Sequence, residues 1–166
     1  SAGFIEGYYY KPRIDMELLR QRHEGLIALS ACLSGDVPKL LLQGRYDEAR
    51  DLALEFESIM GKGNYFLEIQ NHRISDEQKV TASLYRLSQD TGIPLAATND
   101  CHYINRQDAE MQNVLLCIQT GKTLDEPNSI SFETNEFYVK SAEEMAELFP
   151  GHEDAVRNTV KIAERC

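Results

Sequence analysis

Short apolar runs alternate with helical segments along this chain, and this alternation limits its possible folds more than any other feature. Three runs are apolar almost throughout: GLIALSAC (25–32), NYFLEIQ (64–70) and IPLAAT (93–98). Strands that alternate with helices indicate βα units and a mostly parallel sheet. Strands this apolar predict burial on both faces. We therefore expect an α/β fold, although the pattern alone does not separate an open sheet from a barrel.

The segments between and after these runs have helical signals. Residues 36–43 predict a short helix that Gly44 ends, and residues 46–60 predict a longer one. One face of the longer helix is apolar: Tyr46, Ala49, Leu52, Ala53, Phe56, Ile59 and Met60. Residues 75–91 predict another helix, with Ser75 and Gln78 at capping-box spacing and Gly92 at its end. Its expected inner face is Val80, Leu84 and Leu87.

The last third of the chain is predicted to be mainly helical. Residues 106–120 form a helical pattern that ends at Gly121, with apolar residues at Met111, Val114, Leu115 and Ile118. Residues 136–140 predict a short strand, and Ser141 with Glu144 predicts a second capping box. The final helix, 152–166, is expected to turn Val156, Val160 and Ala163 inward.

Composition excludes several classes of protein. The chain has 166 residues and a net charge of −10, which is unlike a basic nucleic-acid clamp. It has neither an apolar run of membrane-spanning length nor a signal-peptide pattern, so we expect a cytoplasmic protein with no membrane partner. The four cysteines form no C-x-x-C pair and are expected to be free thiols. The basic residues Lys11, Arg13, Arg20 and Arg22 are expected to be solvated, with a phosphate contact as the alternative.

Metal-capable side chains lie at the carboxyl ends of all three predicted strands. Cys32 ends the first, His72 follows the second, and Asp100 with His102 follows the third. The carboxyl ends of parallel strands share one edge of the sheet, where α/β proteins bind ligands. The i, i+2 spacing directs Asp100 and His102 to the same side of an extended segment. Cys101 points to the other side, and we interpret it as a packing residue. These donors suit zinc or a similar divalent ion.

Each of these residues also has a structural interpretation. Cys32 is consistent with a small buried side chain, and His72 with a capping or supporting role. His23 and His152 lie in polar helical contexts, and we expect both to be solvated. GKT at 121–123 has the ending of a phosphate-binding loop, but Leu116 replaces the required glycine and a helix precedes it. A helix end at Gly121 is the better interpretation.

Several long blocks resemble one known family. EGYYYKPRID, HEGLIALSACLSGDVP, IPLAATNDCHY, LLCIQTGKTLDEPN and EFYVKSAEEMAELF are similar to the alpha (catalytic) subunits of bacterial DNA polymerase III. The resemblance runs through nearly the whole chain. It implies that residues 1–119 are the C-terminal half of a PHP (polymerase and histidinol phosphatase) domain. Residues 120–140 would be a connector, and residues 141–166 a helical lead into the polymerase core.

The resemblance also implies a fold and a site. The family's PHP domain is a distorted (β/α)7 barrel that holds zinc or manganese and, in many members, is linked to 3′→5′ exonuclease proofreading. The covered ligand positions correspond to Cys32, Asp100 and His102, with no catalytic acid or base assigned. The family's H-x-H motif and its magnesium-binding polymerase carboxylates have no counterpart here. The chain therefore resembles a fragment that we expect to be inactive alone.

The resemblance leaves two alternatives to a proofreading module. One is a free-standing PHP phosphoesterase that acts on a small phosphate monoester, which the polymerase-like residues 120–166 disfavour. The other is a non-catalytic scaffold for the polymerase. In either polymerase role, the implied partners are DNA and the other subunits of the replicase.

Overall fold

Three short parallel strands form the centre of the fold in the computed structural model, which describes residues 2–125 and 134–166. They lie in the order β1-β2-β3, with bounds Ala28–Leu29, Tyr65–Ile69 and Leu95–Ala97. Leu29 lies opposite Phe66, and Leu67 lies opposite Leu95. All three predicted strands are confirmed, each shorter than its apolar run. The described sheet is a small parallel one, and the barrel stays a prediction.

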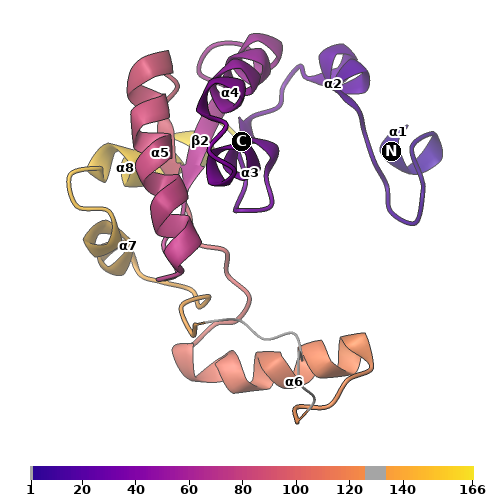
Figure 1. The fold of residues 1–166 in the computed structure, drawn as a ribbon, viewed down its shortest axis with the longest axis vertical. Helices are drawn as coiled ribbons and strands as arrows, with labels where there is room; N and C mark the ends of the chain where they lie inside the picture. Colours follow the sequence, from indigo (N-terminus) through magenta and orange to yellow (C-terminus); the bar gives the residue numbers. More distant parts are fainter. Residues whose placement is uncertain (1, 126–133) are drawn as a thin grey trace.

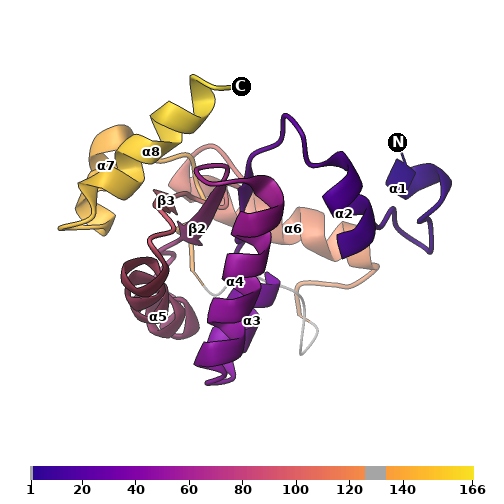
Figure 2. The ribbon, with the colours of Figure 1, turned by 90° about the horizontal axis from the view of Figure 1, so that it is seen from above.

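Three helices lie in the connections between the strands: α3 (Asp36–Leu42), α4 (Tyr46–Met60) and α5 (Ser75–Thr91). Both α4 and α5 contact β2, and α3 packs against these two helices. Figure 2 shows α3, α4 and α5 beside β2 and β3. The seven apolar positions predicted for α4 all belong to the core or pack against it. The predicted inner face of α5 is confirmed, because Val80, Leu84 and Leu87 are buried. The 3.6-residue period therefore predicted both of the long helices that pack on the sheet.

The strand β2 is buried on both faces, as predicted. Tyr65, Leu67 and Ile69 join the core that α4 and α5 cover, while Phe66 and Glu68 alternate with them. Phe66 is also buried, and Glu68 is half-buried. Alternating side chains of a strand point to opposite faces, so the second face is covered as well.

The two predicted capping boxes have different outcomes. Ser141 and Glu144 form one at the start of α7 (Ala142–Leu148), with the Ser141 amide 2.8 Å from a Glu144 carboxylate oxygen. The box predicted for Ser75 and Gln78 is wrong, because Ser75 is already helical and Ile74 is the N-cap residue. Early in this helix, Glu77 instead accepts hydrogen bonds from His72.

The last helix, α8 (Glu153–Ala163), packs against β3, but not entirely with the face that we predicted. Val156 is half-buried, whereas Val160 and Ala163 are exposed. The buried residues are Ala155 and Asn158, and the Asn158 amide donates to the Leu95 carbonyl at 2.7 Å. A polar residue faces inward here because the backbone of β3 offers it an acceptor.

Three of the remaining elements lie away from this core: α1 (Ala2–Ile5), the 3₁₀ turn η1 (Arg106–Asp108) and α6 (Ala109–Thr120). The helix α2 (Met16–Arg22) instead packs its Leu19 side chain against the core. Figure 1 shows α6 apart from the sheet and from the helices that cover it. Gly121 ends α6 with φ 67°, which confirms the predicted stop. The predicted apolar residues of this helix are exposed: Met111, Val114, Leu115 and Ile118.

Two further observations concern the whole described chain. Part of the predicted connector, residues 126–133, lies outside the described residues. Among the helices of the described part, none has the length and apolar character needed to cross a membrane.

Candidate metal centre

The carboxyl ends of β2 and β3 form a continuous polar edge. The Thr98 amide donates to the Ile69 carbonyl at 3.1 Å, so the segments that follow β2 and β3 also lie side by side. The Gln70 side chain donates to the Thr98 hydroxyl oxygen at 3.2 Å. The segment 99–103, which contains both D-x-H residues, therefore begins at the edge that the strand pattern predicted.

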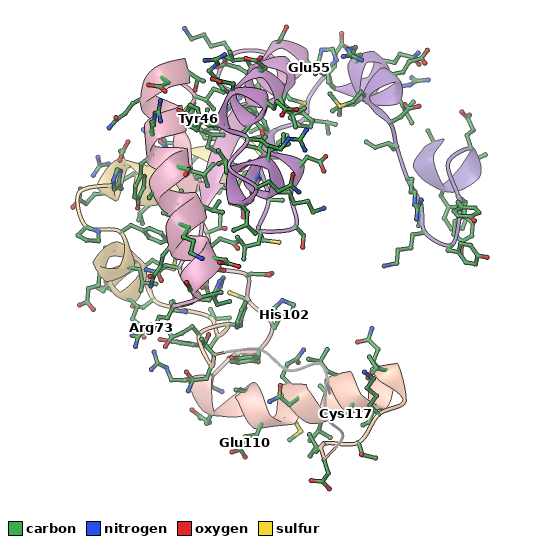
Figure 3. The ribbon with its side chains drawn as sticks, viewed as in Figure 1. Tyr46, Glu55, Arg73, His102, Glu110 and Cys117 are labelled. Atoms are coloured by element: carbon green, nitrogen blue, oxygen red, sulfur yellow. The ribbon has the colours of Figure 1, made fainter. Side chains whose placement is uncertain are left out.

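Asp100 and His102 lie beside each other on this edge. The Asp100 carboxylate Oδ1 is 3.4 Å from His102 Nε2, as the i, i+2 spacing predicted. Both side chains are partly open to solvent, with 44% and 37% of their areas exposed. A carboxylate oxygen and an imidazole nitrogen this close fit two ligand positions of one divalent ion. Figure 3 shows His102 between the start of α5, near Arg73, and the helix α6.

The backbone of Phe137 holds His102 in place. The amides of His102 and Tyr103 both donate to the Phe137 carbonyl, at 2.8 and 3.3 Å. The strand predicted for 136–140 is wrong, because a single bridge between Tyr103 and Tyr138 replaces it. The chain segment around Phe137 thus supports the site without joining the sheet.

Asn99 and Cys101 attach the same segment to Tyr138. The Asn99 side-chain amide donates to the Tyr138 carbonyl at 2.6 Å, and the Cys101 thiol approaches that oxygen at 3.6 Å. Cys101 is exposed, so our interpretation of it as a packing residue is wrong. The cysteines that the structure describes are all free thiols, as predicted.

His72 is fully buried and contacts the backbone of the site. Its Nδ1 lies 2.7 Å from a Glu77 carboxylate oxygen, and its Nε2 lies 3.3 Å from the Asp100 amide nitrogen. Its ring stacks on Phe137, with centroids 4.0 Å apart. These contacts confirm a supporting role for His72. Its position after a strand was the only sequence signal.

A group of charged side chains surrounds the buried Glu136 next to the site, and sequence reasoning missed it. Glu136, only 4% exposed, pairs with Arg106 at 3.2 Å and with Arg73 and Lys140 at 3.5 Å each. The Lys140 ammonium also donates to the side-chain amide oxygen of Asn99 at 3.3 Å. Burial lowers the pKa of Lys140, while the Glu136 carboxylate opposes that change. This group joins η1 to the segment that carries Phe137.

Cys32 lies at the end of β1, in a small cavity that Glu68, Gln70 and Glu77 also line. Its side chain is half-buried. Within residues 2–125 and 134–166, no three His, Cys, Asp or Glu side chains are grouped closely enough to hold a metal ion. The structure therefore brings Asp100 and His102 together and does not add Cys32 to them. Metal binding by all three residues stays a prediction.

The two other histidines are less solvated than we predicted. His152 is half-buried and stacks on Tyr85, with ring centroids 3.7 Å apart. His23 is also half-buried, and its Nδ1 lies 2.9 Å from the Arg20 carbonyl. Their helical contexts gave no sign of these neighbours, because Tyr85 lies on another helix and the Arg20 carbonyl is a backbone group.

Comparison with known proteins gives the same family as the sequence blocks. Residues 1–72 match the model of the PHP domain. The chain is 51% identical over 166 residues to the DNA polymerase III subunit alpha of Treponema pallidum. The corresponding subunits of Borreliella burgdorferi and Deinococcus radiodurans are 45% and 46% identical over 166 and 169 residues.

The chain matches DNA polymerase III alpha subunits over its whole length. The predicted resemblance is thereby confirmed. Each match covers 100% of this chain but only 13–14% of the relative, so the chain spans about one seventh of these subunits. The predicted boundaries at residues 119 and 140 stay predictions.

Proposed function

We propose that this chain is a segment of a replicative DNA polymerase and contributes part of a metal-dependent 3′→5′ exonuclease site. The observation that carries the proposal is the Asp100–His102 pair at the strand edge, with 3.4 Å between its two donor atoms. The whole-length similarity to DNA polymerase III alpha subunits supports it. DNA and the other replicase subunits are the corresponding partners, and the magnesium-dependent polymerase site lies outside this segment.

The donor set fits zinc or manganese at this edge. Asp100 would supply a carboxylate oxygen and His102 an imidazole nitrogen, and Cys32 would supply a thiolate if it approached them. A bound divalent ion would supply an activated water and polarise the terminal phosphodiester. The role of this chain is to orient the ligands. The Phe137 carbonyl fixes the backbone of His102, and His72 contacts that of Asp100.

A purely structural PHP module is the second candidate. The specific observation in its favour is that the described residues contain no group of three metal-capable side chains. Two donors are fewer than a catalytic zinc site uses, which is three protein ligands and a water. An exonuclease therefore requires further ligands, and we place them in the parts of the longer subunit beyond this chain.

The test uses the full-length subunit with a primer that carries a mismatched 3′ end, in the presence of Mn²⁺. Asp100→Asn keeps the shape of the side chain but removes its charge, so we expect a loss of at least about 100-fold in nuclease rate. Asp76→Asn is the matched control, because Asp76 is half exposed on α5 and pairs only with Lys79 among the ion pairs of the described residues.

The outcomes separate the candidates. A nuclease rate that Asp100→Asn lowers and Asp76→Asn leaves unchanged supports the exonuclease. A full-length subunit without nuclease activity, or with activity that Asp100→Asn does not change, favours the structural module. Hydrolysis of a phosphate monoester without nuclease activity would favour the phosphoesterase.

A further inference from the structure

The contacts of the buried His72 determine which of its ring nitrogens donates a hydrogen bond and which accepts one. Nε2 lies 3.3 Å from the Asp100 backbone nitrogen, whose N–H can only donate. Nε2 must therefore accept, and the ring proton resides on Nδ1. From Nδ1, the proton is donated to a Glu77 carboxylate oxygen at 2.7 Å. The hydrogen bond to Asp100 thus depends on the one to Glu77.

Glu77 fixes the backbone of His72 as well as its ring. Its second carboxylate oxygen accepts the His72 backbone N–H at 2.7 Å. Glu77 is only 7% exposed, and both of its oxygens have donors within His72. A buried carboxylate with both oxygens bonded resists rearrangement, because any movement leaves a charge without a donor.

Phe137 contacts both His72 and the segment 99–103 that carries Asp100 and His102. Its ring lies parallel to the His72 ring, with a centroid distance of 4.0 Å and an interplanar angle of 6°. Its carbonyl accepts the amide of His102 at 2.8 Å. The Thr134 hydroxyl also donates to the His72 carbonyl at 2.8 Å. The two residues that hold the backbone of segment 99–103, His72 and Phe137, therefore stack on each other.

We propose that His72, held by Glu77, is a positioning residue that fixes the Asp100 backbone so that Asp100 and His102 bind one divalent ion. The metal-binding part of this inference rests on the proposed function, whereas the positioning part does not. His72 itself would not touch the ion. Ligands bind tightly when neighbouring groups hold their orientation, and loss of such a neighbour typically costs about 10- to 100-fold in metal affinity.

The first variant is His72→Phe in the full-length subunit. It keeps a ring that stacks on Phe137 but removes the acceptor for Asp100 and the donor for Glu77. We expect Mn²⁺, titrated and followed by its electron paramagnetic resonance signal, to bind about 10-fold or more weakly. We also expect faster hydrogen exchange in the peptide that contains residues 97–103. His152→Phe is the matched control, since His152 also stacks on an aromatic ring but lies outside the site.

Two further variants separate positioning from general loss of structure. His72→Gln can place an amide oxygen near the position of Nε2, so we expect it to restore Mn²⁺ affinity to within about threefold of the parent. Glu77→Gln keeps the shape of the carboxylate, but its amide oxygen can accept only one of the two His72 donors. We expect Glu77→Gln to weaken Mn²⁺ binding and to speed exchange at 97–103, even if His72→Phe fails to fold.

Two measured quantities make the outcomes distinguishable. Faster exchange at 97–103 together with weaker Mn²⁺ binding in Glu77→Gln supports the inference. Parental exchange and parental affinity in folded Glu77→Gln and His72→Phe proteins would overturn it. If the parent binds no Mn²⁺, the proposed function and the metal-binding part of the inference fail. The rate of hydrogen exchange at residues 97–103 then decides whether His72 positions the backbone of Asp100.

Discussion

At the scale of single residues, the candidate site depends on residues that are not themselves candidate metal ligands. Asp100 and His102 were predicted from their spacing and from the strand before them. Phe137 was not, because a backbone carbonyl has no residue signature and its partner His102 is 35 positions away in the sequence. Proximity between distant segments follows from tertiary packing, which a local pattern does not contain.

Phe137→Ala should destabilise the chain strongly. The Phe137 side chain is buried and stacks on His72, so its removal leaves a cavity that costs about 3–5 kcal/mol. Urea unfolding of the 166-residue chain measures the loss. Val139→Ala is the control, since Val139 is 57% exposed and should cost less than about 0.5 kcal/mol. Equal losses for the two variants would contradict this role of Phe137.

At the scale of elements, periodicity predicted the inner faces of α4 and α5 and misjudged part of that of α8, which also packs on the sheet. The faces of α4 and α5 were correct because a parallel sheet offers them an apolar surface. The face of α8 was partly wrong because Asn158 finds a backbone acceptor at Leu95. Apolar spacing cannot reveal such an acceptor, and a hydrogen bond of this kind lets a polar residue replace an apolar one in the core.

Asn158→Ala should therefore cost more than truncation of a valine on the same helix. The change leaves the buried Leu95 carbonyl without the Asn158 donor, which costs about 1–3 kcal/mol. Val160→Ala, on the exposed side of α8, should change the free energy of unfolding by less than about 0.5 kcal/mol. Thermal unfolding of both variants checks the order, and a larger effect of Val160→Ala would refute the assignment of the faces.

The start of α7 gives a dependence on pH. The Tyr138 hydroxyl donates to Glu144 at 2.6 Å and, with the Ser141 amide, lowers the pKa of Glu144 below its ordinary value of 4.5. The folded state therefore favours the ionised carboxylate. This contribution is present above pH 4.5 and is lost as the pH falls through the folded pKa.

Glu144→Gln tests this dependence because glutamine keeps the capping-box pattern without the charge. We expect the variant to be less stable than the parent near neutral pH. The difference should shrink below the ordinary glutamate pKa of 4.5, as urea unfolding at both pH values would show. A stability difference that stays constant between the two pH values would argue against an ionised Glu144 in this bond.

At the scale of the whole molecule, the order of strands and helices from β1 to α6 was predictable, whereas α1, α2 and the placement of α6 were not. The apolar pattern of α6 is that of a packed helix, yet Met111, Leu115 and Ile118 are each more than half exposed. A sequence period reports that a face is apolar, and it does not report which surface covers that face. The same holds for the candidate site. The sequence predicted that the metal-capable side chains share one edge of the sheet, but it did not predict the distances between them.

The metal content of the full-length subunit tests the central claim most directly. We would purify the parent and His102→Ala, dialyse both against a trace of zinc and manganese, and measure the metal bound per protein. The account predicts bound metal in the parent and a clear loss in His102→Ala, with the same thermal unfolding profile for both proteins when a chelator has removed the metal. A parent that binds no metal, or a variant that binds as much as the parent, would contradict a metal centre at Asp100 and His102.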